Sequence, residues 1–271
     1  MKDINKVINS DSLLYLKKIE SESIDLILTD PPYNTTDCKW DKKINYSEYW
    51  KEWKRIIKPT GTIIITAQMP FLVKISEPGL DWYRHKFIWE KDKCGNFLAA
   101  KAGPLKYTED ILIFQKQGYY KPHNCTGKKP KGIYKPIMRS GTGKPKKTNS
   151  ERLGLSINSI NNRKKRSPLI SNPETDGKKR FPADIIYFSV PYKNRIHPTQ
   201  KPQLLFEYLI KTYTNENMIV LDCFSGSGTT ATAALKTKRN YICIEKNYDM
   251  FKKSKERIEK YKNYLKSLLF Y

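Results

Sequence analysis

Short apolar runs rich in β-branched residues alternate along this chain of 271 residues with segments whose apolar positions recur every three or four residues. Such runs are typical of buried strands, and the intervening spacing is typical of amphipathic helices. The runs predict seven strands: Lys6–Asn9, Ile24–Thr29, Thr62–Thr66, Lys86–Glu90, Asp110–Gln115, Met218–Asp222 and Tyr241–Glu245. The alternation predicts an α/β fold with a mostly parallel seven-stranded sheet and helices on both faces.

Four segments have apolar residues at helical spacing. They are Leu13–Ile19, Tyr46–Ile57, Thr199–Tyr213 and Tyr248–Leu269. Asp11 is placed to cap the first helix, and Pro202 is tolerated in the third only within its first turn. The second helix carries Tyr49, Trp50 and Trp53, and we expect these aromatic side chains to lie in the core.

The strand predicted at Ile24–Thr29 ends in Asp30-Pro31-Pro32-Tyr33. Prolines cannot donate to a sheet, so the chain turns outward here, at the kind of strand end where ligands bind in α/β folds. Asp30 and a freed carbonyl can accept both hydrogens of an exocyclic amine, while Tyr33 offers a ring for stacking a planar base. The alternative is a plain Pro-Pro turn with a solvent-facing aspartate.

A second motif near the carboxyl end joins the strand ending at Asp222 to a glycine turn, Phe224-Ser225-Gly226-Ser227-Gly228-Thr229. Its two glycines allow the backbone to approach a ligand closely. About twenty residues on, Glu245 has the position of an acid that accepts hydrogen bonds from ribose hydroxyls. A phosphate loop is excluded because no Gly-Lys-Ser/Thr follows, and the third glycine of a dinucleotide fingerprint is absent. A nucleoside ligand without a pyrophosphate fits better.

Lys and Arg outnumber Asp and Glu by 51 to 27, giving a net charge of +24 that favours a polyanionic partner over a merely lysine-rich soluble protein. Residues 118–180 hold 17 Lys or Arg against three acidic residues. This basic segment is either a disordered insert or a segment that orders on nucleic acid. Its contact clusters would be Lys144, Lys146 and Lys147, then Arg163, Lys164, Lys165 and Arg166, and finally Lys178, Lys179 and Arg180.

Five scattered cysteines show neither disulfide nor metal spacing, so we expect reduced thiols and no metal site. They are Cys38, Cys94, Cys125, Cys223 and Cys243. The amino-terminal segment lacks the apolar stretch of a signal peptide, and no run approaches the roughly 20 apolar residues of a membrane span. We therefore expect a soluble cytoplasmic protein that does not bind membranes.

Together these motifs resemble the DNA amino-methyltransferases, in the β arrangement whose catalytic tetrad precedes the S-adenosylmethionine loop. The family's (Asp/Asn/Ser)-Pro-Pro-(Tyr/Phe/Trp) tetrad is matched at Asp30–Tyr33, its Phe-x-Gly-x-Gly loop at Phe224–Gly228, and its HPTxKP stretch at His197–Pro202. On its own, His197 reads equally well as a structural residue. The segments Asn96–Lys101 and Tyr107–Leu112 also look like the family's middle strands.

The resemblance implies a circularly permuted, Rossmann-like S-adenosylmethionine-dependent methyltransferase fold. Residues 1–117 and 181–271 would form the catalytic domain, with 118–180 as a target-recognition insert. It makes Asp30, Pro31, Pro32 and Tyr33 catalytic. The cofactor-binding residues that it implies are Asp11, which helps to hold the adenine, Asp30, Thr199, Gln200, Lys201, Asp222, Phe224, Ser225, Gly226, Ser227, Gly228, Thr229 and Glu245.

The implied activity is site-specific methylation of a base flipped out of double-stranded DNA, by direct displacement and without a metal. In the family, Asp at the first tetrad position usually accompanies adenine N6 and Ser cytosine N4, although the two amines are chemically alike. The alternatives are a DNA cytosine N4-methyltransferase, an RNA adenine methyltransferase and an inactive DNA-binding homologue. The resemblance also suggests a homodimer, and a cognate restriction endonuclease, a phage genome or a solitary role would leave the same motifs.

If the basic segment contacts DNA, replacing Lys164 and Lys165 with Gln will weaken binding. The slope of log K against log salt will flatten by roughly 0.9 per lost phosphate contact. Binding titrations at several salt concentrations measure this slope, and an unchanged slope would make the segment a passive insert.

Overall fold

The computed structural model describes residues 3–33, 44–94, 100–116, 132–140, 179–180, 182–192, 195–197 and 199–268. Internal contacts divide the chain into two units, Met1–Lys135 with Asp184–Tyr271, and Pro136–Ala183. In the second unit, β6 (Arg139–Ser140) pairs antiparallel with β7 (Lys179–Arg180). The other predicted contact residues of the basic segment, from Lys144 to Lys178, lie outside the described residues, as does most of Asn96–Lys101.

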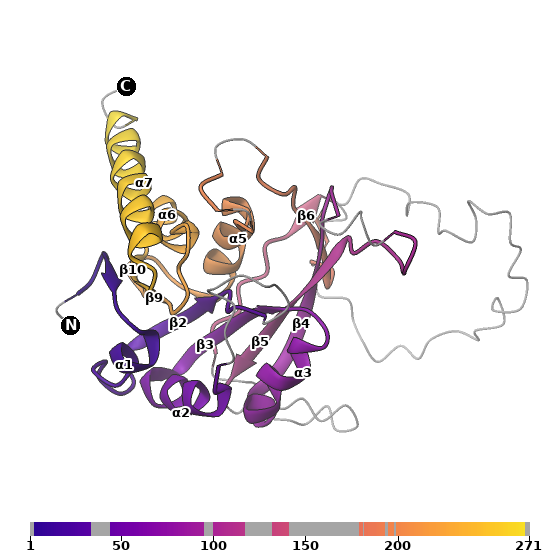
Figure 1. Cartoon of the computed structure of the whole chain (residues 1–271), viewed down its shortest axis with the longest axis horizontal. Coiled ribbons are helices and arrows are strands. Elements are labelled where there is room, and N and C mark those ends of the chain that lie inside the picture. The colour runs from indigo at the N-terminus through magenta and orange to yellow at the C-terminus, as the bar shows by residue number, and fades with distance from the viewer. Residues whose placement is uncertain are drawn as a thin grey trace, which may run out of the picture. The chain divides into compact units, whose positions relative to one another are not determined.

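The first unit is built on an eight-stranded sheet in the order β1-β10-β9-β2-β3-β5-β4-β8 (Figure 1). The strands are β1 (Lys6–Asn9), β2 (Ile24–Thr29), β3 (Ile57–Ala67), β4 (Tyr83–Glu90), β5 (Thr108–Gln115), β8 (Ile185–Tyr187), β9 (Ile219–Asp222) and β10 (Asn240–Glu245). All seven predicted strands are confirmed. The sheet has one strand more than predicted, β8. The sequence pattern did not show it because β8 has three residues, of which only Ile186 is buried.

The sheet is mostly parallel, as predicted. Five of its seven pairings are parallel, and only β5 runs antiparallel to its neighbours β3 and β4. The carboxyl ends of the other strands therefore meet the amino end of β5 at one edge of the sheet. Loops from distant parts of the sequence converge at this carboxyl edge, where open α/β sheets bind their ligands.

Helices cover both faces of the sheet (Figure 1). One buried cluster joins strand residues to α1 (Ser12–Leu16), α2 (Tyr46–Ile56) and α3 (Phe71–Ser76). The other joins them to α5 (Gln203–Tyr213), α6 (Thr229–Lys236) and α7 (Tyr248–Ser267). Within the described part of the chain, no helix combines the length and apolar character needed to cross a membrane.

The ends of two helices follow from local chemistry. Asp11 caps α1 as predicted, since its carboxylate accepts hydrogen bonds from the backbone N–H groups of Leu13 at 3.0 Å and Leu14 at 3.3 Å. The predicted start of the third helix at Thr199 is wrong, because α5 begins at Gln203. Pro202 precedes it in an extended conformation with ψ of 129°, and the residue before a proline disfavours helix, so the segment before it stays outside the helix.

The aromatic residues of α2 lie in the core, as predicted, and tie the helix to its surroundings. Trp50 and Trp53 are buried. The indole N–H of Trp50 donates to the carbonyl of Ile75 at 2.6 Å, and that of Trp53 reaches the Sγ of Cys223 at 3.3 Å. The second contact links α2 to the turn after β9.

The 3-10 helix η1 (Glu77–Trp82) approaches α2 so closely that Gly79 touches the ring of Trp50. A Cβ atom at Gly79 would lie 2.2 Å from that ring. We expect Gly79→Ala to lower the free energy of unfolding by about 1–3 kcal/mol through overpacking. Urea unfolding measures this loss. The matched control is Gly103→Ala, whose Cβ would meet no atom within 4 Å, and an equal loss there would contradict the packing argument.

Candidate active site

One pocket of about 1630 Å³ runs along the carboxyl edge of the sheet. Glu245 ends β10, Asp222 ends β9, Asp30 follows β2, and Glu109 lies at the start of β5, so the strand order sets their order across the pocket. Small-molecule pockets usually measure about 300–1,000 Å³. This pocket therefore has room for two ligand groups side by side.

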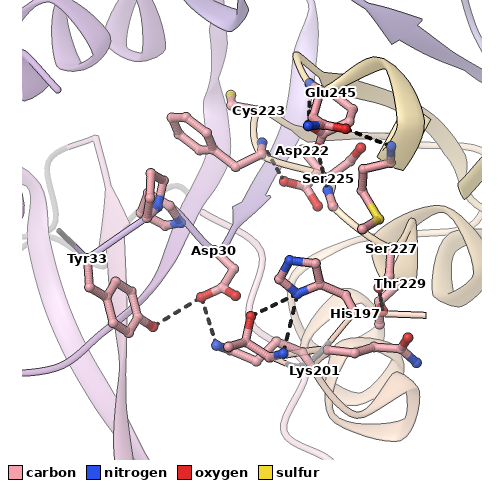
Figure 2. A pocket seen from close by; sticks show the side chains of 18 of the residues that line it. Asp30, Tyr33, His197, Lys201, Asp222, Cys223, Ser225, Ser227, Thr229 and Glu245 are labelled. Atoms are coloured by element: carbon pink, nitrogen blue, oxygen red, sulfur yellow. Dashed lines mark hydrogen bonds and ion pairs between the residues drawn. The ribbon is translucent and has the colours of Figure 1, made fainter. Parts of the chain in front are cut away.

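Asp30 directly follows β2, in which every residue is buried, and lines this pocket. Its Oδ1 accepts hydrogen bonds from the hydroxyls of Tyr33, at 3.0 Å, and Thr66. The same oxygen lies 2.8 Å from the Nζ of Lys201 (Figure 2). All contacts that the described residues make with this carboxylate fall on Oδ1. Oδ2 thus keeps its capacity to accept hydrogen bonds from a ligand.

Lys201 belongs to a buried network of four charges. Its Nζ also lies 2.8 Å from Oε1 of Glu109, and the Nζ of Lys91 lies 2.8 Å from Oε2. Burial alone would raise the pKa of Glu109, but Lys201 and Lys91 outweigh it and lower this pKa to about 2. Burial alone would lower the pKa of Lys201, but Asp30 and Glu109 raise it. Glu109 and Lys201 are therefore both ionised at neutral pH, and each lies between two partners of opposite sign.

Tyr33 is held in the same network. Its hydroxyl lies 2.8 Å from Oε1 of Glu109, and its ring stacks on Phe71 with centroids 4.8 Å apart. Burial, followed by the charges of Asp30 and Glu109, raises the pKa of Tyr33 well above its usual value. The phenol therefore stays protonated, and its single O–H is shared between Oδ1 of Asp30 and Oε1 of Glu109.

The glycine turn after β9 forms the opposite half of the pocket. Gly226 has φ of +47° and Gly228 has φ of +75°, values that favour glycine. The N–H of Gly226 donates to Oε2 of Glu245 at 2.9 Å, and the N–H of Asn247 donates to Oε1 at 2.7 Å. Burial raises the pKa of Glu245, although these hydrogen bonds oppose the shift. A Cβ atom on Gly226 would meet nothing within 4 Å, so open space borders this backbone.

Asp222 connects the two halves. Its Oδ1 accepts hydrogen bonds from the hydroxyl of Thr29 at 2.9 Å and the N–H of Phe224 at 3.0 Å. The hydroxyl of Thr230 donates to Oδ2. Burial raises the pKa of Asp222 to about 6, against these hydrogen bonds. The carboxylate thereby joins the end of β2, just before the tetrad, to the start of the glycine turn.

The structure brings all but one of the predicted catalytic and cofactor-binding residues into this one pocket. Those that line it are Asp11, Asp30, Pro31, Pro32, Tyr33, Thr199, Gln200, Lys201, Asp222, Phe224, Ser225, Gly226, Ser227, Thr229 and Glu245. Gly228 is the exception: it lies behind the turn, where a Cβ atom would contact Ile258 at 3.0 Å.

Asp11 also forms an ion pair with Lys246 at 2.9 Å. Nδ1 of His197 lies 3.0 Å from the hydroxyl of Thr199, and burial lowers the pKa of this histidine.

Glu109 and Lys91 belong to the site but were not predicted to do so. Glu109 lies two residues before the apolar run Ile111–Phe114, and a carboxylate at the start of a buried strand is a signal that could have identified it. Lys91 directly follows β4 and resembles an ordinary surface lysine in the sequence. In the described part of the chain, no group of three metal-binding side chains is found, and Cys94, Cys223 and Cys243 are free thiols.

Comparisons with known proteins agree with this geometry. A family model described as DNA methylase matches residues 24–256. The type II methyltransferase M.HpaI of Haemophilus parainfluenzae is 30% identical over 271 residues, which span 94% of this chain and 74% of that protein. The DNA adenine methyltransferase YhdJ of Escherichia coli K12 is 30% identical over 269 residues, which span 93% and 82%. The chain belongs to the N6-adenine/N4-cytosine family of DNA amino-methyltransferases.

Solved structures share its fold. The M1.HpyAVI–SAM complex has a TM-score of 0.58 at 23% identity, covering 93% of this chain and 98% of that one. The cytosine-N4-specific PvuII DNA methyltransferase has a TM-score of 0.59 at 16% identity, covering 95% and 91%. The fold is shared with a cytosine-N4-specific enzyme, whereas the sequence relative YhdJ is an adenine methyltransferase, so the comparisons do not select the target base.

We expect Glu109→Gln to leave Lys91 and Lys201 short of one buried negative charge, which lowers the free energy of unfolding at neutral pH by about 3–5 kcal/mol. In the wild type, the pKa of Glu109 is lowered from 4.5 to about 2. The extra free energy of unfolding of the wild type over Glu109→Gln is therefore complete above pH 4.5 and is lost as the pH falls toward 2. Urea unfolding of both proteins at pH values above and below 4.5 measures how this stability difference decreases. The exposed Glu90→Gln variant is the control, with an expected change within about 0.5 kcal/mol. A constant difference in the free energy of unfolding between wild type and Glu109→Gln across this range would contradict an ionised Glu109.

Proposed function

We propose that this protein is a site-specific DNA methyltransferase that transfers the methyl group of S-adenosylmethionine to N6 of adenine. The observation that carries the proposal is that Asp30, whose Oδ2 has no contact with the described residues, shares one pocket with the glycine turn and Glu245. An acceptor for an amine and a nucleoside site thus adjoin each other, as methyl transfer between two ligands requires.

The residues around the glycine turn fit the cofactor. Ser225 has a buried hydroxyl without a hydrogen-bond partner among the described residues, and it lines the pocket. Glu245 would accept hydrogen bonds from the ribose hydroxyls, and the open space beside Gly226 allows close approach. Asp11, Asp222 and Asp249 also line this half, and acidic groups favour a cationic ligand. When bound, S-adenosylmethionine supplies an electrophilic methyl group.

The tetrad provides the acceptors for the amine of the target base. Oδ2 of Asp30 takes one amine hydrogen, while Tyr33, Thr66 and Lys201 hold Oδ1 in place. The carbonyl of Pro32 already accepts from the hydroxyl of Tyr46 at 2.9 Å, which leaves the carbonyl of Pro31 as the second acceptor. Hydrogen bonds to both amine hydrogens favour a nucleophilic nitrogen geometry and stabilise the positive charge that develops on it.

The choice of adenine rests on Asp30, since Asp at this position usually accompanies adenine in the family, and on similarity to an adenine methyltransferase. The base would be flipped out of double-stranded DNA, because an amine inside the stack is inaccessible.

Residues 118–180 are proposed as the target-recognition insert. Type II methyltransferases among the relatives support a cognate restriction endonuclease as a partner, and the family resemblance suggests a homodimer.

We expect nucleoside mass spectrometry of plasmid DNA incubated with the protein and S-adenosylmethionine to detect N6-methyladenine. Asp30→Asn should lower the turnover number by about 10²–10³-fold, because an amide replaces one oxygen acceptor with a donor. Cofactor affinity, measured by calorimetry, should fall far less than turnover, because the glycine turn and Glu245, which provide most of the proposed cofactor contacts, are untouched. The matched control is Asp110→Asn, which removes a carboxylate paired with Lys86 at the surface.

N4-methylcytosine as the sole product would refute the adenine assignment and retain the methyltransferase. Equal loss of turnover in Asp30→Asn and Asp110→Asn would remove the special role of Asp30. Preferred methylation of structured RNA over duplex DNA would instead favour an RNA substrate.

A further inference from the structure

The pocket has opposite charges at its two halves. Around the ends of β10 and β9, its lining contains four acidic residues, Asp11, Asp222, Glu245 and Asp249, against two cations, Lys246, which pairs with Asp11, and Lys253. Around the ends of β4 and β8, it contains the cations Lys91, Lys93, Lys106 and Arg195. The lining acid on this side, Glu109, is already neutralised by Lys91 and Lys201. The lining of the β4–β8 half therefore holds more basic than acidic side chains.

Three separate segments build this basic half. The N–H of Lys91, after β4, donates to the carbonyl of Tyr107, before β5, at 2.8 Å. The N–H of Val190, after β8, donates to Oδ1 of Asp92 at 2.8 Å. These bonds hold the chain after β4 between its neighbours on both sides. The charged ends gathered there come from residues far apart in the sequence.

An exposed aromatic side chain, Tyr192, lies beside these cations at the edge of the pocket. Tyr192 is 71% exposed, and the Nζ of Lys93 lies 3.8 Å from the centroid of its ring. Lys93, Lys106 and Arg195 are exposed as well. We call Lys93, Lys106, Tyr192 and Arg195 the basic rim. A solvated surface alone gives no reason to gather three cations and an exposed ring at the mouth of a pocket, because like charges repel one another.

We infer that the basic rim binds the phosphodiester backbone of the DNA strand that carries the target base, beside the flipped nucleotide. This inference rests on the proposed function. A flipped base that reaches Asp30 leaves its flanking phosphates at the mouth of the pocket. Positive side chains next to an exposed aromatic ring are the combination that holds unpaired nucleic-acid strands. The cationic cofactor is favoured at the acidic half, so the two ligands are sorted by charge.

The test compares two double variants with the same change in charge. Lys93→Gln with Lys106→Gln removes two rim cations. Lys211→Gln with Lys236→Gln removes two exposed cations from the last turns of α5 and α6, which lead to the amino ends of β9 and β10, away from the pocket. The basic segment is unchanged in both, so its contribution to binding cancels.

The probe is a short fluorescein-labelled duplex of mixed sequence, with or without a single unpaired adenine, and the readout is fluorescence anisotropy at several salt concentrations. Wild type should prefer the unpaired adenine, because most of the flipping cost is then removed. The rim variant should bind that probe roughly tenfold more weakly, with a slope of log K against log salt flatter by about 0.7–0.9 per lost contact. The far-end variant should keep the preference and stay within about threefold of wild type.

If the rim and far-end variants bind both probes equally well, the inference is wrong and the rim is only a solvated surface. Binding is measured without turnover, so this result is independent of the product assay. A rim-dependent preference for unpaired adenine, combined with no methylated base in the wild-type assay, would refute the proposed reaction and retain the rim as a strand-binding surface.

Discussion

The ammonium of Lys201, buried between the carboxylates of Asp30 and Glu109, is the interaction on which the site depends. Removing an ammonium from water costs several kcal/mol, so the lysine is stable here only because both carboxylates lie at hydrogen-bonding distance. Lys201 precedes α5, whereas Asp30 follows β2 and Glu109 lies in β5. The ion network therefore joins three parts of the chain and orients Asp30 with one oxygen anchored and the other available.

The sheet supplies the second constraint. β2 and β9 are distant in sequence but pair in parallel, and the hydrogen bond from Thr29 to Asp222 joins their carboxyl ends. The tetrad and the glycine turn lie side by side because β2 and β9 pair with each other. Which of the two motifs comes first along the chain therefore does not change the pocket. Strand order also separates the acidic half near β10 from the basic half near β4. Two ligands of opposite charge can thus lie side by side with their reacting groups near Asp30.

Buried strands were predictable because a strand covered on both faces has an almost continuous apolar run, as in β2. The tetrad and the glycine turn were predictable because proline and glycine restrict the backbone in ways that are evident from residue type alone. β8 was missed since one buried residue in three leaves no pattern. Glu109 and Lys91 were missed because a charged residue at a strand end usually faces solvent, and only their ion pairs with residues from other parts of the chain place these two in the site.

The sequence by itself determined the α/β class, seven strands, the capped first helix and the types of chemical group at the two motifs. These properties depend on residue identity and on spacing over a few positions. Only the tertiary structure decided which oxygen of Asp30 is engaged, that Glu109 stays ionised while buried, and that Lys93 meets Tyr192 at the rim. Such properties depend on distances and burial among residues from different strands, because electrostatic energies change steeply with both.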